Sequence, residues 1–161
     1  MVRDGSHMTE EERSLAFGWL TVVMRIFKIF KVEGQRWKQA IRKEYIEENL
    51  WGRLKLLGPS VRPWIEKNFL QTNEEEEKYV LPKFGIDKLQ SWILVIVLLL
   101  SNFKTEFRPF AEFFQTTASA FDKIIMICGA SMNNKSDNEA EIKLKFPLQG
   151  LNSGKKRAVG R

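Results

Sequence analysis

The run from Trp92 to Leu100 consists of nine apolar residues, and no other stretch of the chain is as uniformly apolar. A helix that is apolar on every side has to be buried on every side. Asp87, followed three residues later by Gln90, forms a plausible cap pair for the start of such a helix. We therefore predict that residues 88–103 form the buried central helix of a small domain, with the other helices packed around it.

Two other structures are possible for this run. A transmembrane helix needs about 20 predominantly apolar residues, and widening the run to 89–103 brings in Gln90, Ser91, Ser101 and Asn102. The β-branched residues in the run also allow a buried strand, because periodicity alone does not separate a short buried strand from a buried helix. The length of the run and its cap pair favour a core helix.

The residue inventory limits the possible sites. The chain has 161 residues, a length within the usual range for one domain, and 43% of them are hydrophobic. Residues 1–8 end in the sequence GSHM, which is typical of an expression-tag remnant. His7 is the only histidine and Cys128 the only cysteine, which excludes an intrachain disulfide and a Cys–His metal site. No cofactor is predicted. With no secretory signal pattern, an intracellular protein is favoured, either cytoplasmic or nuclear.

Helix caps and apolar spacing define the other predicted elements. Thr9 and Glu12 form a capping box at the start of the first helix. Gly58-Pro59 is a strong stop signal after the second helix. We predict an all-α fold, a compact bundle of four or five helices in a domain spanning 9–130, without an internal repeat. The predicted helices cover residues 9–34, 35–57, a short segment after Pro63, 88–103 and 105–129.

Two polar segments are predicted outside the core. Residues 131–161 are predicted to form a flexible, disordered basic tail, because their composition turns polar after Gly129. Residues 141–146 of this tail alternate between polar and apolar, which allows a short strand against a partner. The four glutamates Glu74–Glu77 are predicted to be the solvated start of a helix. The alternative is that they mimic an anionic partner and fold over the basic residues.

Positive charge is unevenly distributed in this chain of formal charge +6. Between Arg25 and Lys43 there are seven basic residues and one acidic residue. Such clusters favour polyanionic partners, and Trp37 either stacks on an unpaired base or belongs to the core. The candidate nucleic-acid or anion contacts are Arg25, Lys28, Lys31, Arg36, Trp37, Lys38, Arg42, Lys43, Lys155, Lys156 and Arg157.

Catalytic residues are scarce. Without a histidine outside residues 1–8, a general base would have to be a carboxylate, a lysine or a tyrosine with a shifted pKa. The glycines are scattered singly and form no phosphate-binding loop. We therefore predict a noncatalytic binding protein rather than an enzyme, with nucleic acid, most of all RNA, as its partner.

Two alternatives remain open for the partner. The first is a peripheral module that binds anionic membranes through a basic face, a layout that resembles retroviral-type matrix domains. The second is a helical protein–protein interaction or homo-oligomerisation domain, because many aromatic residues in a small domain favour an exposed apolar groove. Residues 45–51 also fit a Tyr-x4-Leu-apolar pattern, which resembles the short helix that translation-regulating proteins offer to the cap-binding factor.

Overall fold

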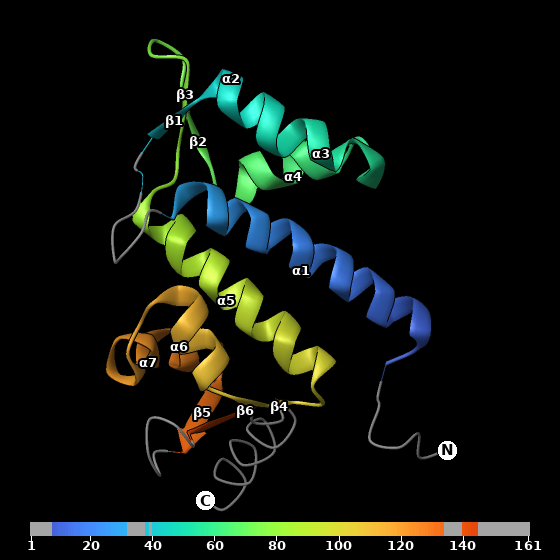
Figure 1. Cartoon of the computed structure of the whole chain (residues 1–161), viewed down its shortest axis with the longest axis vertical. Helices are drawn as coiled ribbons and strands as arrows, with labels where there is room; N and C mark the ends of the chain where they lie inside the picture. The colour runs from blue at the N-terminus through green and yellow to red at the C-terminus, as the bar shows by residue number, and fades with distance from the viewer. Residues whose placement is uncertain (1–7, 32–37, 39, 134–139, 145–161) are drawn as a thin grey trace, which may run out of the picture. The chain divides into compact units, whose positions relative to one another are not determined.

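The structure is a computed structural model that describes residues 8–31, 38, 40–133 and 140–144. It divides into two compact units. The first unit is Thr9–Ile96, and the second unit takes up the chain from Val97 onward. Helix α5 (Lys83–Leu100) begins in the first unit and ends in the second (Figure 1).

Helix α1 (Glu10–Phe30) starts at the predicted capping box, which the structure confirms. The Thr9 hydroxyl accepts a hydrogen bond from the Glu12 backbone N–H at 3.2 Å, and the Glu12 carboxylate accepts one from the Thr9 N–H at 2.8 Å. The buried residues of α1 begin only at Val22. Leu15 and Phe17, nearer its start, are 64% and 51% exposed. The N-terminal half of α1 is therefore not a core helix.

The predicted second helix, 35–57, contains a strand. Residues Ala40–Arg42 form β1, and a helical stretch follows from Lys43 to Leu57. A Cβ atom on Gly52 would lie 3.2 Å from the Glu47 carbonyl oxygen, which explains the glycine after the π-helical part. The stretch ends at Gly58, whose φ of 99° is open to glycine at little cost. Its parts are α2 (Lys43–Ile46), the π-helix η1 (Glu47–Trp51), α3 (Gly52–Leu54) and the 3-10 helix η2 (Lys55–Leu57).

A short helix and a hairpin complete the first unit. Helix α4 (Val61–Asn68) is followed by β2 (Gln71–Asn73) and β3 (Lys78–Val80). The strands are antiparallel in the order β1-β3-β2 and lie beside α2 in Figure 1. Glu74–Glu77 form the turn between β2 and β3, which we call the acidic turn. The prediction of a helix start there is wrong, because the chain reverses into paired strands.

Three tryptophans join the helices of the first unit. The ring of Trp64 on α4 lies 4.6 Å from Trp19 on α1 and 5.3 Å from Trp92 on α5, between ring centroids. Trp92 is 36% exposed, so the prediction that this helix is buried on every side is wrong. None of the described helices is long and apolar enough to span a lipid bilayer.

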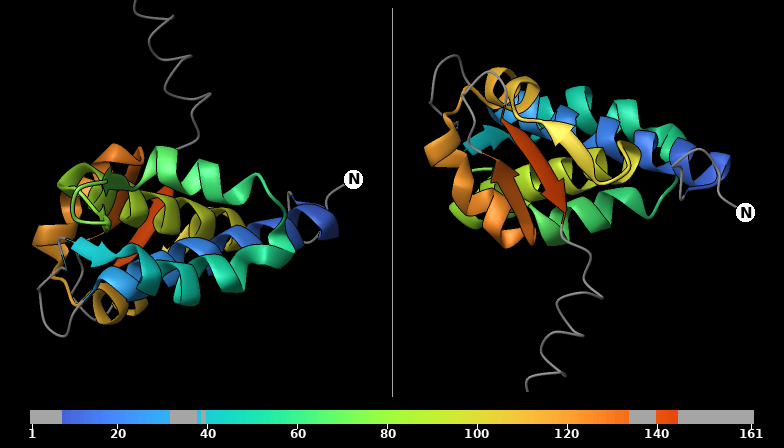
Figure 2. Two further views of the ribbon diagram at one scale, coloured as in Figure 1. Left: turned by 90° about the horizontal axis from the view of Figure 1, so that it is seen from above. Right: turned by 90° about the horizontal axis from the view of Figure 1, so that it is seen from below.

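The second unit has its own sheet and an aromatic core. Strands β4 (Lys104–Glu106), β5 (Ala130–Asn133) and β6 (Glu141–Leu144) are antiparallel in the order β4-β6-β5, side by side in the right-hand view of Figure 2. Helices α6 (Arg108–Phe114) and α7 (Ala118–Ile127) follow β4. Phe114 and Phe121 join these helices, with ring centroids 5.3 Å apart.

The predicted helix 105–129 is interrupted. Gln115 takes the left-handed conformation, with a φ of 52°, and ends α6. The hydroxyl of Thr117 then accepts a hydrogen bond from the Ala120 N–H at 3.2 Å and caps α7. The apolar spacing continues across this break because both helices face the same core. Gly129, with a φ of 70°, follows α7 at the position predicted for its end.

The predicted fold class, an all-α bundle around one buried helix with a disordered C-terminal tail, is wrong. The described part of the chain combines helices with two three-stranded antiparallel sheets. The central strand of the second sheet, β6, lies within the predicted tail and pairs inside the chain. Residues 145–161 lie outside the described residues. The domain limits 9 and 130 stay a prediction.

One order of elements occurs twice along the chain. The elements α1 to β3 and the elements α5 to β6 each run helix, strand, helix, helix, strand, strand, if the helical stretch 43–57 counts as one helix. Most of α5 nevertheless belongs to the first unit. In each sheet the last strand lies between the first two. The prediction of no internal repeat missed this order, because the repeat lies in topology and not in residue pattern.

Replacing Gly85 tests the packing of α5 against the end of α4. A Cβ atom on Gly85 would lie 2.5 Å from the Phe69 carbonyl oxygen and 2.9 Å from Leu81 Cδ1. We expect Gly85→Ala to lower the free energy of unfolding by about 1–3 kcal/mol through overpacking. Gly18→Ala is the control, since nothing lies within 4 Å of its added Cβ. It should raise stability by about 0.5–1 kcal/mol. Urea denaturation measures the free energy of unfolding of both variants. If both were stabilised equally, the close packing around Gly85 would be contradicted.

Candidate nucleic-acid interface

The described candidate contacts lie in the first unit, at the end of α1 and around β1. They are Arg25, Lys28, Lys31, Lys38, Arg42 and Lys43. The other predicted contacts, Arg36, Trp37, Lys155, Lys156 and Arg157, lie outside the described residues.

Three of these side chains are exposed and close in the fold. The Lys38 backbone N–H donates to the Phe30 carbonyl oxygen at 2.8 Å, which places Lys38 beside the last turn of α1, where Lys28 lies. Arg42 follows on the exposed side of β1. Lys28, Lys38 and Arg42 form no ion pair with any residue that the structure describes. We call these three residues the basic edge.

Arg25 and Lys31 are less accessible than the basic edge. Both are half-buried, and Arg25 Nη1 donates to the Asn49 carbonyl oxygen on η1 at 3.4 Å. Burial lowers the pKa of Lys31. Arg25 therefore has a structural contact with η1. Arg25 and Lys31 are weaker candidates for nucleic-acid contacts than Lys28, Lys38 and Arg42.

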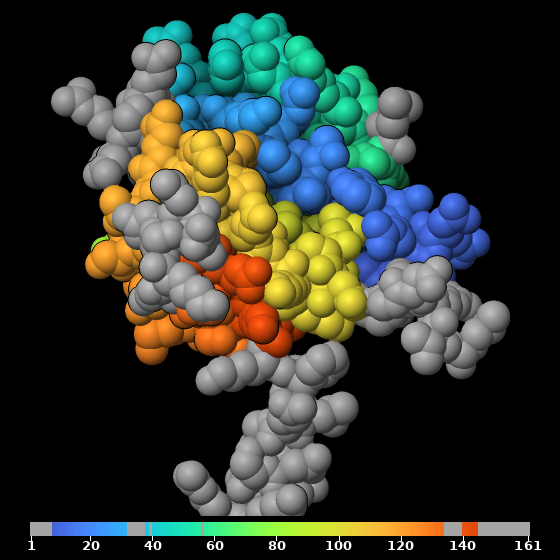
Figure 3. All heavy atoms as spheres, turned by 60° about the horizontal axis from the view of Figure 1, so that its bottom comes forward, coloured from blue at the N-terminus to red at the C-terminus, as the bar shows by residue number. Residues whose placement is uncertain are grey.

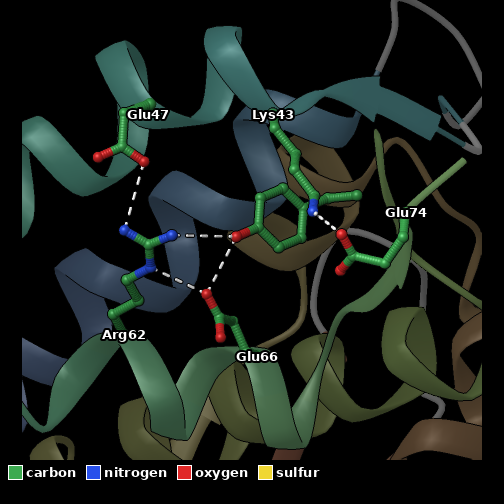
Figure 4. Close-up of polar contacts among 6 residues, drawn as sticks. Lys43, Glu47, Arg62, Glu66 and Glu74 are labelled. Atoms are coloured by element: carbon green, nitrogen blue, oxygen red, sulfur yellow. Dashed lines mark hydrogen bonds and ion pairs between the residues drawn. The ribbon is translucent and has the colours of Figure 1, made fainter. Parts of the chain in front are cut away.

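Lys43 is neutralised by the acidic turn. Its ammonium lies 2.8 Å from Glu74 Oε2 (Figure 4), and its backbone N–H donates to the Glu77 carbonyl oxygen at 2.9 Å. The hydrogen bond with Glu74 raises the pKa of Lys43 and lowers the pKa of Glu74. The acidic turn thus does fold against the basic cluster. Among the described candidate contacts, Lys43 is the one that it neutralises through an ion pair.

We expect Glu74→Gln to lower the pKa of Lys43 toward its usual value, because the variant loses the carboxylate that stabilises the ammonium. The pair is intact above the pKa of Glu74 and below the pKa of Lys43. A pH titration of the Lys43 side chain by NMR measures the change. Glu75→Gln, on the same turn, should leave this pKa unchanged, and an equal shift in both variants would contradict the pairing.

A second polar cluster ties α4 to η1 and β3. Arg62 Nε donates to Glu66 Oε1 at 2.9 Å, and Arg62 Nη1 lies 3.3 Å from Glu47 Oε2 (Figure 4). Arg62 Nη2 donates to the Tyr79 hydroxyl at 3.4 Å, and that hydroxyl donates to Glu66 Oε1 at 3.0 Å. The hydrogen bond to Glu66 is the main reason that the pKa of Arg62 is raised. These contacts orient the guanidinium, although the Arg62 side chain is 49% exposed.

Trp51 lies beneath this network. The Arg62 guanidinium lies 5.1 Å from the centre of its ring, and Tyr79 packs edge-on with centroids 5.9 Å apart. Trp51 is 4% exposed, and its Nε1–H has no hydrogen-bond partner among the described residues. Leaving a buried donor unpaired costs about 1–3 kcal/mol.

The sequence analysis did not predict this cluster, because its members come from three separate elements. Trp51 appeared there only within the pattern at residues 45–51. Leu50 and Trp51 are both buried, so that pattern is not a surface motif.

The third helix of each repeat, α4 or α7, carries few free basic side chains. On α4, Arg62 is held by two glutamates, and Lys67 is exposed. On α7, Asp122 lies beside Lys123, and the exposed Met126 and Ile127 are apolar. Neither helix presents a strongly basic face.

The described charges of the second unit balance. Lys104 pairs with Glu141 at 3.2 Å, and Arg108 pairs with Glu112 at 3.1 Å. Figure 3 shows the face of this unit on which α7, β5 and β6, in orange and red-orange, reach the surface. The described charged residues are four basic and four acidic: Lys104, Arg108, Lys123 and Lys143, and Glu106, Glu112, Asp122 and Glu141. Among the described residues, the positively charged surface is therefore on the first unit.

Comparison with known proteins identifies the family. No curated protein sequence matches the chain. The model of the family described as A49-like RNA polymerase I associated factor matches residues 10–159, which is nearly the whole chain and includes both units. Membership links the protein to RNA polymerase I and its nucleic-acid machinery, and implies a nuclear, nucleolar location. The chain belongs to the A49-like RNA polymerase I associated factor family.

Proposed function

We propose that this protein is a noncatalytic factor of RNA polymerase I that holds duplex DNA through its phosphates. The observation that carries the proposal is the repeated order helix, strand, helix, helix, strand, strand in a polymerase-associated family. A winged-helix domain, a helix-turn-helix variant with a small sheet, has this order. Helix-turn-helix proteins place their second motif helix in the major groove of DNA. RNA, the partner favoured from composition, fits this scaffold less well, because the major groove of A-form RNA is deep and narrow.

The basic edge supplies the phosphate contacts in this proposal. Lys28, Lys38 and Arg42 are exposed, and no described acid pairs with them. Lysine and arginine that neutralise phosphates release counterions, which makes such binding strongly dependent on salt. The acidic turn lies next to this edge and limits its reach, since phosphate is repelled by glutamate. Binding is therefore proposed to follow one face of the first unit.

The third helices, α4 and α7, favour binding that does not depend on the base sequence. Direct readout needs side chains that are free to make bidentate contacts with base edges, most often arginine on guanine. Arg62 on α4 is already held by Glu47 and Glu66. Phosphate contacts alone position a protein on DNA without reading its sequence. A factor of a polymerase that moves along its template needs this kind of contact.

The variant Lys38→Glu/Arg42→Glu tests the basic edge. Fluorescence anisotropy with a 20-base-pair duplex should show weaker binding at low salt. A plot of log affinity against log salt concentration has a negative slope. Its magnitude should decrease by about 2, since two phosphate contacts are lost. Arg53→Glu/Lys83→Glu is the control, because it makes the same change in charge at two exposed residues on α3 and α5. This control should keep most of the slope.

The same titration separates the other candidate partners. Tighter binding of single-stranded RNA than of the duplex would replace DNA with RNA in the proposal. Sedimentation with vesicles that contain acidic lipid, without oligonucleotide binding, would favour the anionic-membrane alternative. An equal loss in both double variants would remove the basic edge from the site.

A further inference from the structure

We propose that Arg42 and Lys78 together hold one phosphate of the DNA backbone, and that the Glu76 carboxylate occupies the place of this phosphate in the free protein. Lys78 is then a further phosphate contact beside the basic edge, and Glu76 is an internal competitor of the DNA. This inference rests on the proposed function, because it adds one residue and its competitor to the same duplex contact.

The register of the first sheet places the two cations side by side. Arg42 on β1 lies directly opposite Lys78 on β3 in the antiparallel ladder. Residues in such a pair point to the same face of the sheet, with Cβ atoms about 4.5–5.5 Å apart. The next pair, Ile41 and Tyr79, is buried, and side chains alternate between the two faces along a strand. Arg42 and Lys78 therefore lie on the outer face of the sheet.

Two like charges that lie opposite each other destabilise a strand pair, so this pair favours an anion beside it. Glu76 is the anion that the structure shows there, with its Oε2 atom 3.1 Å from Lys78 Nζ. Arg42 has no ion pair with any residue that the structure describes. One carboxylate thus accompanies two cations. Lysine and arginine both form charge-assisted hydrogen bonds with phosphate oxygens, so a backbone phosphate can bond both side chains.

The ion pair of Glu76 is of a kind that phosphate can displace. The Glu76 side chain is 58% exposed, and its partner Lys78 is only two residues further along the chain. Exposed ion pairs contribute little to stability. The Glu76 backbone N–H donates to Asn73 Oδ1 at 3.2 Å. The carboxylate can therefore rotate away from Lys78 while the backbone of the acidic turn keeps its hydrogen bond.

The other ion pair of the acidic turn does not belong to this site. Lys43 Nζ pairs with Glu74 and lies 5.9 Å from the centre of the Tyr79 ring. Tyr79 alternates with Lys78 along β3, so its ring points to the opposite face of the sheet. The acidic turn thus holds one lysine on each side, and Lys78 is the one that shares a face with Arg42.

Lys78→Gln tests the phosphate contact, with the same 20-base-pair duplex and salt titration as above. Binding should weaken at low salt, and the magnitude of the salt slope should decrease by about 1, since one phosphate contact is lost. Lys78→Arg keeps the charge and should bind as tightly as the unsubstituted protein. Lys83→Gln removes one exposed charge at the start of α5 and should leave the slope unchanged. Far-UV circular dichroism checks that each variant is folded.

Glu76→Gln tests the competitor. It should tighten duplex binding several-fold, because Lys78 is then free to bond phosphate. Glu75→Gln removes the same charge from the same turn, but Glu75 has no ion pair with a described residue, so its gain should be clearly smaller. Adding Glu76→Gln to Lys78→Gln should give little gain, because the lysine that the carboxylate covers is absent.

Two results would overturn this inference alone. The first is an equal salt slope for Lys78→Gln and Lys83→Gln. The second is an equal gain from Glu76→Gln and Glu75→Gln, or a gain from Glu76→Gln that persists without Lys78. The acidic turn would then act only through its overall charge.

Failure of the proposed function gives a different result. If the unsubstituted protein did not bind the duplex at low salt, both proposals would be overturned. The same holds if Lys38→Glu/Arg42→Glu bound as tightly as its control, since Arg42 belongs to both sites. Binding that depends on the basic edge but not on Lys78 would leave the proposed function in place and remove only this inference.

Discussion

Both units depend on the lack of a polar face on the middle of α5. Leu89, Ile93, Leu94 and Ile96 are buried in the part of this helix that belongs to the first unit. Leu98, two residues after Ile96, is buried in the part that belongs to the second. An apolar helix is stable in water only where most of it is covered, and α5 has buried residues in the stretches that belong to both units. One helix therefore takes part in two hydrophobic cores, where the sequence analysis predicted a single core.

Helices could be predicted from the sequence far better than strands. The capping box at Thr9 and the glycine at 129 act within a few residues of themselves, so local reading locates them. The strands have three or four residues each, too few for an alternating pattern to stand out. Gln71–Asn73 contains no apolar residue at all and is a strand only because β3 pairs with it. Pairing of that kind depends on distant residues that a local pattern does not contain.

The candidate interface was predictable as a set of charges but not as an arrangement. Lys28, Lys38 and Arg42 stay exposed, as basic residues in a charge cluster usually do. Lys43 belongs to the same run, yet it is paired, because the β2–β3 hairpin brings Glu74 to it across 31 residues. The environment of Trp51 was unpredictable for the same reason. Its neighbours Arg62 and Tyr79 come from α4 and β3 and meet it only in the folded chain.

The contacts of Arg62 show why α4 is a poor candidate for base readout. In helix-turn-helix proteins, the N-terminal residues of the recognition helix contact base edges. Here the Arg62 guanidinium instead bonds Glu47, Glu66 and Tyr79 and covers the ring of Trp51. Both carboxylates and the guanidinium are partly exposed, so each of these ion pairs contributes at most about 1 kcal/mol. The contacts of Arg62 with Glu47, Glu66 and the Trp51 ring therefore direct its guanidinium toward the protein itself.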